Sequence, residues 1–211
     1  MPSSRDGIVI WVTGLPESGK STFARRLRSE LLEVGRQSLV LDGDLVRAAL
    51  APSPGYGPRA RDRFYETLAR LAALLARQRL TVIVAATASR RAYRRTARGL
   101  APRFLEVYLD VPLERCERRD RKRLYARARA GELSGLPGVD AAFEPPERPD
   151  VIARGGRDGR AVREVVERLG ETPRGNHLRW ATQATRPALP PAQRLRGHAE
   201  APRLGDRPSG A

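Results

Sequence analysis

Hydrophobic residues along the chain fall into short apolar runs that alternate with longer amphipathic segments. The runs are rich in β-branched residues, and they predict buried strands over residues 7–13, 38–42, 80–86, 104–110 and 150–153. The segments between them repeat their apolar residues at helical spacing, which predicts helices over 20–34, 58–79, 112–120 and 160–169. Strands that alternate with helices are typical of an α/β fold, a parallel sheet covered by helices on both faces.

Two of these helices have predicted core faces. The face of the first is assigned to Phe23, Leu27, Leu31 and Leu32. The face of the second is assigned to Phe64, Leu68, Leu71, Leu74 and Leu75. Trp11 in the first strand and the lone cysteine, Cys116, are also expected in the core.

The end of the chain changes composition. Residues 132–149 are rich in Gly, Pro and Glu and predict a mobile loop inside a domain that covers residues 1–171. Residues 172–211 carry seven arginines and two acids, 7 − 2 = +5, with little apolar periodicity. They predict a basic, Pro/Arg-rich disordered tail.

Several classes of protein are excluded by the same inspection. One cysteine cannot form an internal disulfide, which favours the reducing cytoplasm over a secreted scaffold. No apolar run approaches the roughly 18 residues that span a bilayer, and the first residues do not form a signal peptide, so no membrane partner is expected. Both histidines lie near the C-terminus, which argues against a His-based triad or zinc site in the domain.

Charge indicates an anionic partner. The chain has 40 basic and 24 acidic residues and a net charge of +16. Only Lys20 and Lys122 are lysines, so 40 − 2 = 38 are arginines, a bias that weakens the case for nucleic acid. No platform of aromatic residues interleaves the arginines of 90–98 and 115–129, and most of these arginines are assigned to solvated helix faces.

Residues 14–21 match the phosphate-binding pattern G-x-x-x-x-G-K-[ST] between a predicted strand and a predicted helix. Glycines let the backbone N–H groups wrap phosphates, and the helix N-terminus adds a favourable dipole. Lys20 would hold the β- and γ-phosphates of ATP and Ser21 a Mg²⁺ ion. The alternative is a Gly-rich turn that only starts a helix. The predicted nucleotide-binding residues are Gly14, Leu15, Pro16, Glu17, Ser18, Gly19, Lys20, Ser21 and Thr22, with Arg119 packing on the base.

A second motif, Asp42-Gly-Asp44-x-x-Arg47, follows the second predicted strand, where strand ends face the ligand crevice. Asp42 and Asp44 could orient a hydroxyl acceptor or bind magnesium through water, and Arg47 could grip an anionic acceptor. The structural alternative is an N-cap pair in which Asp44 caps a short helix.

These motifs, together with a longer block at 106–132 and its continuation at 138–146, resemble the adenylylsulfate kinase family of P-loop kinases over residues 8–170. The long block runs from Glu106 through Asp110, Cys116 and Lys122 to Glu132. The resemblance implies transfer of the γ-phosphate of ATP to the 3′-hydroxyl of adenylylsulfate, which gives 3′-phosphoadenylylsulfate for sulfate assimilation.

The resemblance also implies roles for single residues. It makes Lys20, Asp44, Lys122 and Ser89 the catalytic set, and Ser21 with Asp44 the metal-binding pair. It places Asp42, Asp44, Arg47, Tyr56 and Arg61 at the acceptor, with loop packing as the alternative role of Tyr56. Ser89 aligns, only when a one-residue gap is allowed, with a family serine that is often recorded as a phosphorylated intermediate. Direct in-line transfer needs no such intermediate. A homodimer is left open.

The chain departs from the family pattern on the acceptor side. Phe64 stands where the family has Asn, and Leu136-Pro137 stands where it has Phe-Thr. A kinase of another small hydroxyl acceptor, such as a nucleotide-linked metabolite or an antibiotic, is therefore the first alternative. A nucleic-acid-binding protein that uses the P-loop as a nucleotide sensor is the second.

Overall fold

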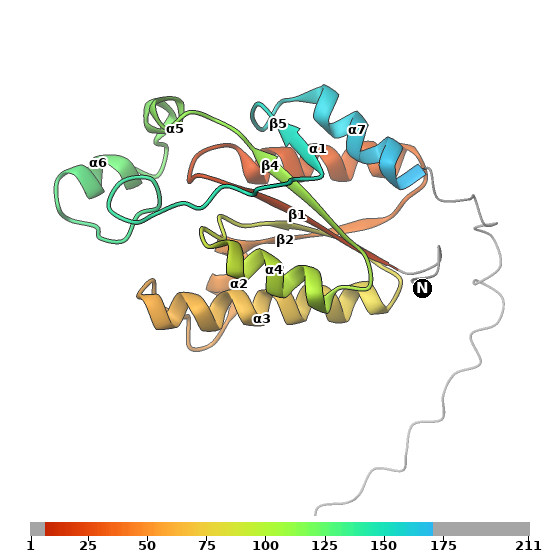
Figure 1. Ribbon diagram of the computed structural model, residues 1–211, viewed down its shortest axis with the longest axis horizontal. Helices are drawn as coiled ribbons and strands as arrows, with labels where there is room; N and C mark the ends of the chain where they lie inside the picture. Colours follow the sequence, from red (N-terminus) through yellow and green to blue (C-terminus); the bar gives the residue numbers. More distant parts are fainter. Residues whose placement is uncertain (1–6, 171–211) are drawn as a thin grey trace, which may run out of the picture. The chain divides into compact units, whose positions relative to one another are not determined.

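The computed structural model describes residues 7–170, which belong to one compact unit built on a five-stranded sheet (Figure 1). The strands are β1 (Ile8–Gly14), β2 (Ser38–Asp42), β3 (Thr81–Ala85), β4 (Phe104–Leu109) and β5 (Val151–Ala153). Their order is β2-β3-β1-β4-β5, and every neighbouring pair is parallel. The fold class is therefore the predicted one. The predicted tail, 172–211, lies outside the described residues.

The helices are α1 (Lys20–Glu33), α2 (Gly43–Ala49), α3 (Pro58–Arg77), α4 (Arg91–Leu100), α5 (Leu113–Arg119), α6 (Leu124–Arg129) and α7 (Gly159–Gly170). Helices α1 and α7 cover one face of the sheet, and α3 and α4 cover the other (Figure 1). None of the helices between residues 7 and 170 is long and apolar enough to cross a membrane.

The central position of β1 in the sheet explains why its sequence is a continuous apolar run. Ile8, Ile10 and Val12 pack in the core with α1 and α7, whereas Val9 and Trp11 pack in the core with α3. Because both faces are covered, every position of β1 is buried, and the strand shows no alternation of apolar and polar residues. Cys116 is also fully buried, as predicted, and burial raises the pKa of its thiol.

The predicted strands and longer helices are confirmed within two residues at their ends, but three predicted core positions are wrong. Leu71 on α3 is only partly buried and belongs to neither core cluster. Leu32 on α1 is 64% exposed and Leu74 on α3 is 58% exposed. Helix α3 instead packs closely against the sheet through small residues, namely Ala69, Ala72, Ala73 and Ala76. The spacing of the leucines alone therefore predicted a buried face of α3 that is rotated from the observed one.

The predicted loop over 132–149 is held by its own polar contacts. The carboxylate of Asp140 accepts hydrogen bonds from the backbone N–H groups of Gly135 (2.5 Å) and Leu136 (2.6 Å). These backbone hydrogen bonds hold the pKa of Asp140 below its usual range. They shape residues 133–137 into a wall beside the carboxyl ends of the strands.

Candidate active site

A cavity of about 1080 Å³ opens where β1, β2 and β3 end. Its wall contains nine arginines, two lysines and four carboxylates, so 11 − 4 = +7. The arginines are Arg25, Arg47, Arg61, Arg115, Arg119, Arg121, Arg127, Arg154 and Arg157. A concave wall with this excess of positive charge attracts and concentrates anionic ligands.

The phosphate-binding loop between β1 and α1 needs its two glycines. Gly14 and Gly19 adopt φ angles of +151° and +100°, which favour glycine. A Cβ atom on Gly14 would lie 2.9 Å from the carbonyl oxygen of Leu109, and one on Gly19 would lie 2.9 Å from the backbone nitrogen of Gly156. Gly19 provides no side-chain cap for α1, so the N–H groups of the first turn are available to phosphate.

Lys20 lies over this loop. Its Nζ donates hydrogen bonds to the carbonyl oxygens of Gly14 (3.1 Å) and Leu15 (2.7 Å). Burial lowers the pKa of Lys20 to about 8, with Asp44 the main opposing influence. Of the predicted loop residues, Pro16, Glu17, Gly19, Lys20, Ser21 and Thr22 line the cavity. Leu15 and Gly14 support it from behind by holding the ammonium group.

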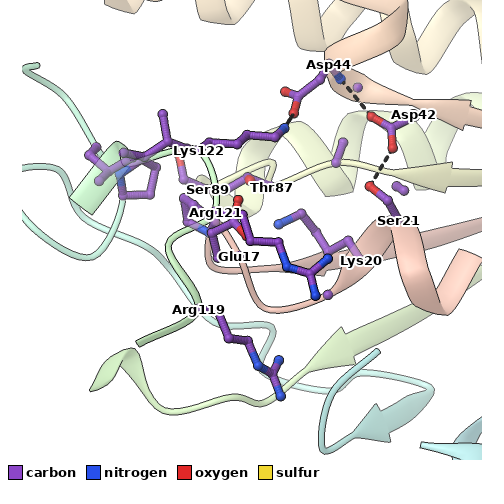
Figure 2. A pocket seen from close by; sticks show the side chains of 18 of the residues that line it. Glu17, Lys20, Ser21, Asp42, Asp44, Thr87, Ser89, Arg119, Arg121 and Lys122 are labelled. Atoms are coloured by element: carbon purple, nitrogen blue, oxygen red, sulfur yellow. Dashed lines mark hydrogen bonds and ion pairs between the residues drawn. The ribbon is translucent and has the colours of Figure 1, made fainter. Parts of the chain in front are cut away.

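A chain of polar contacts runs from α1 across β2 to the segment between α5 and α6 (Figure 2). Ser21 Oγ donates to Asp42 Oδ2 at 2.5 Å, and the backbone N–H of Asp44 donates to Asp42 Oδ1 at 3.0 Å. Asp42 is therefore the N-cap of α2, and the alternative that Asp44 caps a short helix is wrong. Asp42, not Asp44, lies beside Ser21.

The carboxylate of Asp44 is free of capping and forms an ion pair with Lys122. The hydrogen bond to Asp44 raises the pKa of Lys122, while partial burial opposes the shift. Both side chains are more than half exposed and line the cavity from opposite sides. The two lysines of the chain thus lie at the same site, one on the phosphate-binding loop and one facing Asp44.

Arg47 is buried, and its guanidinium lies between two aromatic rings. It is 3.7 Å from the ring centroid of Phe64 and 4.5 Å from that of Tyr56. Its Nη1 donates to the carbonyl oxygens of Pro54 (3.0 Å) and Gly55 (2.8 Å). Burial lowers the pKa of Arg47, and Tyr56 is the main opposing influence. The ring of Tyr56 therefore contacts Arg47, which binds the carbonyl oxygens of the loop before Tyr56, and Tyr56 also lines the cavity.

The remaining predicted residues lie on the same cavity wall. Arg61 on α3 donates from Nη2 to the carbonyl oxygen of Gly135 at 2.6 Å, which joins α3 to the 133–137 wall. Ser89 lies in the β3–α4 turn and is 7% exposed. Arg119, at the end of α5, is exposed and lies near Gly19, apart from Asp44 and Lys122 (Figure 2).

Sequence reasoning missed one loop of the site and one buried arginine. The loop between β5 and α7, residues 154–158, lines the cavity and packs directly on the phosphate-binding loop. A Cβ atom on Gly156 would lie 2.5 Å from the carbonyl oxygen of Gly19. The adjacent pair Gly155-Gly156 after a predicted strand was the available signal. The buried arginine is Arg94, which the sequence assigned to a solvated face and which is only 3% exposed.

Comparison with known proteins gives consistent matches. The adenylylsulphate kinase family matches residues 6–154. Adenylyl-sulfate kinase of Paraburkholderia xenovorans is 40% identical over 168 residues, which are 79% of this chain and 93% of that protein. The corresponding enzyme of Microcystis aeruginosa is 40% identical over 148 residues, 70% of this chain and 82% of that protein.

A solved structure agrees with these matches. It is the Mycobacterium tuberculosis APS kinase CysC in complex with AMPPNP and APS, which is 37% identical to this chain with a TM-score of 0.72. The match covers 79% of this chain and 98% of that one. The resemblance in the motifs, the fold and these matches agree, and the chain belongs to the adenylylsulphate kinase family.

Proposed function

We propose that this protein transfers the γ-phosphoryl group of ATP to the 3′-hydroxyl of adenylylsulfate, which gives 3′-phosphoadenylylsulfate. The observation that carries the proposal is one cavity that is lined both by the phosphate-binding loop and by Asp44, Arg47 and Arg61. Both substrates are anionic, and the wall that would surround them has the net charge of +7 worked out above. Family membership supports the same reaction.

At the ATP end, backbone N–H groups of the loop and of the first turn of α1 bind the phosphates. Lys20 turns from the carbonyl oxygens of Gly14 and Leu15 toward the β- and γ-phosphates, where its charge stabilises the transferring group. Arg119 lies on the same side of the cavity and is our candidate to pack on the base.

The residues beside the loop fit a magnesium ion. Mg²⁺ in kinases is held by one or two carboxylates, water and substrate phosphates, not by a cage of protein ligands. Ser21 Oγ and Asp42 Oδ2 offer two hard oxygen ligands 2.5 Å apart, and Asp44 lies two positions after Asp42, in the first turn of α2. Among residues 7–170, no group of three or more His, Cys, Asp or Glu side chains that could hold a metal ion is found. The ion would neutralise phosphate charge there.

At the acceptor end, Asp44 would orient the 3′-hydroxyl and accept its proton, and Lys122 would leave Asp44 to contact the transferred phosphate. Arg47 and Arg61 would bind the phosphosulfate group through charge-assisted hydrogen bonds. Tyr56 covers the same end of the cavity. Phosphorylation of Ser89, a homodimer and a cytoplasmic location stay predictions.

The test is a panel of acceptors assayed by coupled release of ADP. Adenylylsulfate should give the highest kcat/KM, and the product should carry the new phosphate on the 3′-oxygen by mass spectrometry and NMR. Phe64 and Leu136 stand where the resemblance places Asn and Phe, so sugars, nucleosides and aminoglycosides belong in the panel. A higher kcat/KM for one of these would replace adenylylsulfate as the acceptor.

A further inference from the structure

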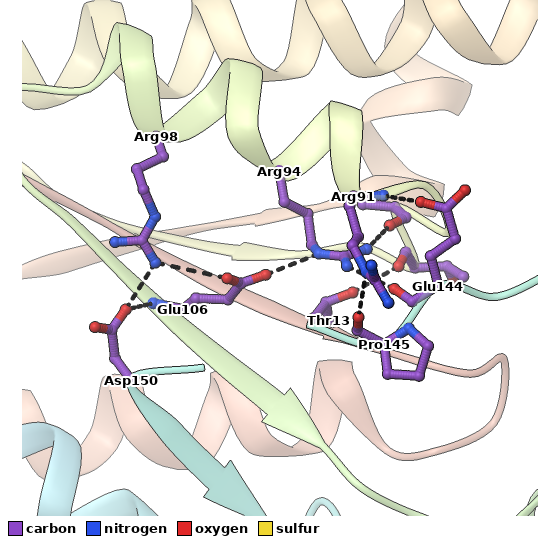
Figure 3. A network of polar contacts seen from close by, with 10 residues as sticks. Thr13, Arg91, Arg94, Arg98, Glu106, Glu144, Pro145 and Asp150 are labelled. Atoms are coloured by element: carbon purple, nitrogen blue, oxygen red, sulfur yellow. Dashed lines mark hydrogen bonds and ion pairs between the residues drawn. The ribbon is translucent and has the colours of Figure 1, made fainter. Parts of the chain in front are cut away.

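Arg94 on helix α4 forms a buried ion pair with Glu106 on β4 (Figure 3). Arg94 Nε donates to Glu106 Oε1 at 2.8 Å, and the two side chains are 3% and 10% exposed. Burial lowers the pKa of Arg94, and Glu106 opposes that shift. Arginine stays protonated under these conditions, so its remaining N–H groups need acceptors inside the protein.

Those acceptors are backbone carbonyls of two segments that flank the cavity. Arg94 Nη1 donates to the carbonyl oxygen of Ala88 at 2.5 Å, and Nη2 donates to that of Glu144 at 2.6 Å. Ala88 lies between Thr87 and Ser89, which both line the cavity. Glu144 comes seven positions after the segment 133–137, which also lines the cavity. One guanidinium therefore joins β4 to the Ala88 turn and to the end of the loop that carries residues 133–137.

The turn at Ala88 is not a relaxed one. Ala88 is fully buried and has a φ angle of +41°, in the left-handed region that non-glycine residues rarely adopt. Its N–H donates to the hydroxyl of Tyr65 at 3.0 Å, and its carbonyl accepts from Arg94. Such a conformation persists only where surrounding contacts hold it, and Arg94 supplies one of the two hydrogen bonds described here.

The two segments are also joined directly. The backbone N–H of Glu144 donates to the carbonyl oxygen of Ser89 at 2.8 Å, and the N–H of Arg91 donates to Glu144 Oε2 at 2.8 Å. The almost fully buried side chain of Arg94 adds its hydrogen bonds to Ala88 and Glu144 to these direct contacts. Its contacts therefore set the distance between the Thr87–Ser89 wall and the end of the 133–144 loop.

We propose that Arg94 is a positioning residue for acceptor binding, which acts by fixing these two walls against each other. The inference rests on the proposed function, because it assigns the walls to the acceptor end of the cavity. The hydrogen bonds described for Arg94 go to Glu106, Ala88 and Glu144, and none of them goes to residues 14–22 of the phosphate-binding loop. Its loss should therefore affect the acceptor more than ATP.

Arg98 provides a matched control on the same helix. It lies one turn further along α4, 3.5 Å from Glu106 and 3.0 Å from Asp150, and its side chain is 44% exposed. Its contacts with these two carboxylates involve neither cavity wall. Arg94→Lys retains the charge for Glu106 but loses the planar fork that reaches two carbonyls at once. Arg98→Lys makes the same chemical change without that consequence.

The experiment compares both lysine variants with the parent enzyme, using the acceptor that the parent turns over best. Arg94→Lys should raise the KM of the acceptor at least about tenfold, because a shift of the two segments would cost the acceptor about as much as one charge-assisted contact, and it should change the KM of ATP less than about twofold. Arg98→Lys should leave both KM values within about twofold. An equal rise in both KM values for Arg94→Lys, or no rise in either, would overturn the proposal.

Hydrogen–deuterium exchange gives a readout that does not need turnover. Peptides covering residues 86–92 and 143–147 should exchange faster in Arg94→Lys than in the parent, while peptides of the phosphate-binding loop stay unchanged. Unchanged exchange in both peptides would refute the positioning role even if adenylylsulfate is not the acceptor. Absence of adenylylsulfate turnover in the parent would refute the proposed function alone.

Discussion

Replacement of the two acceptor-side arginines, Arg47 and Arg61, separates acceptor binding from ATP binding. Each would lose one charge-assisted contact to the phosphosulfate group, about 1.5–3 kcal/mol. Converted at about 1.4 kcal/mol per factor of ten, that loss lowers kcat/KM for adenylylsulfate roughly 10–150-fold. The KM of ATP should change less than about threefold, because neither variant touches the phosphate-binding loop.

The structure predicts a difference between the two variants. Arg47→Ala also removes a guanidinium that packs on Phe64 and Tyr56 and that binds the carbonyls of Pro54 and Gly55. Each of the two ring contacts is worth about 0.5–1 kcal/mol or more, so this variant should also unfold at lower temperature than the parent. Arg61→Ala loses one backbone contact, to Gly135, and should be nearer the parent in stability.

The assay is ADP release with each substrate varied at saturating concentration of the other, supported by a thermal melt of each variant. Arg63→Ala is the matched control, because Arg63 is exposed on the same helix as Arg61 and does not line the cavity. If Arg47→Ala and Arg61→Ala keep the parent kcat/KM for adenylylsulfate, these arginines do not bind the acceptor. If both raise the KM of ATP by the same factor as that of adenylylsulfate, they do not act selectively on it.

Three further predictions concern the chemistry. Lys20→Ala should lower kcat by about 10²–10³-fold or more in a protein that stays folded, and retention of a tenth of the parent kcat would contradict the loop assignment. Because burial lowers the pKa of Lys20 to about 8, its ammonium loses a proton above that pH, and ATP affinity should weaken as pH rises from about 8 to about 9.5. Titration calorimetry should show that weakening in the parent and a flat profile in Lys20→Ala. Asp44→Asn should lower kcat at least about tenfold with smaller changes in either KM, and a change confined to KM would refute its role at the hydroxyl.

Much of the fold could be predicted from the sequence because it depends on local patterns. Strand β1 is buried on both faces, and its sequence is a continuous, mostly β-branched run without alternating polar residues. The phosphate-binding pattern lies at the strand–helix junction where its geometry requires it. The face of α3 could not be read from leucines, because alanines allow the helix to lie close to the sheet and leave Leu74 outside.

The roles of single polar residues depended on partners far away in the chain. Asp42 and Asp44 look equivalent in the motif, and only the fold shows that Asp42 caps α2 beside Ser21 while Asp44 faces Lys122, 78 positions later. Arg94 belongs to an arginine-rich segment in which charge carries little information. Its burial depends on Glu106 from a neighbouring strand, a pairing that spacing within α4 does not reveal.

The structure gives a physical reason for one of the departures from the family pattern, Phe64. Phe64 is 3% exposed, and its ring lies against the guanidinium of Arg47, so an apolar residue is accommodated there by a cation–π contact. The same contact keeps Arg47 in place, because Tyr56 packs on its other face. Restoring Asn at this position would remove one face of the stack and expose the guanidinium. Phe64 therefore packs on the arginine that we propose binds the acceptor anion.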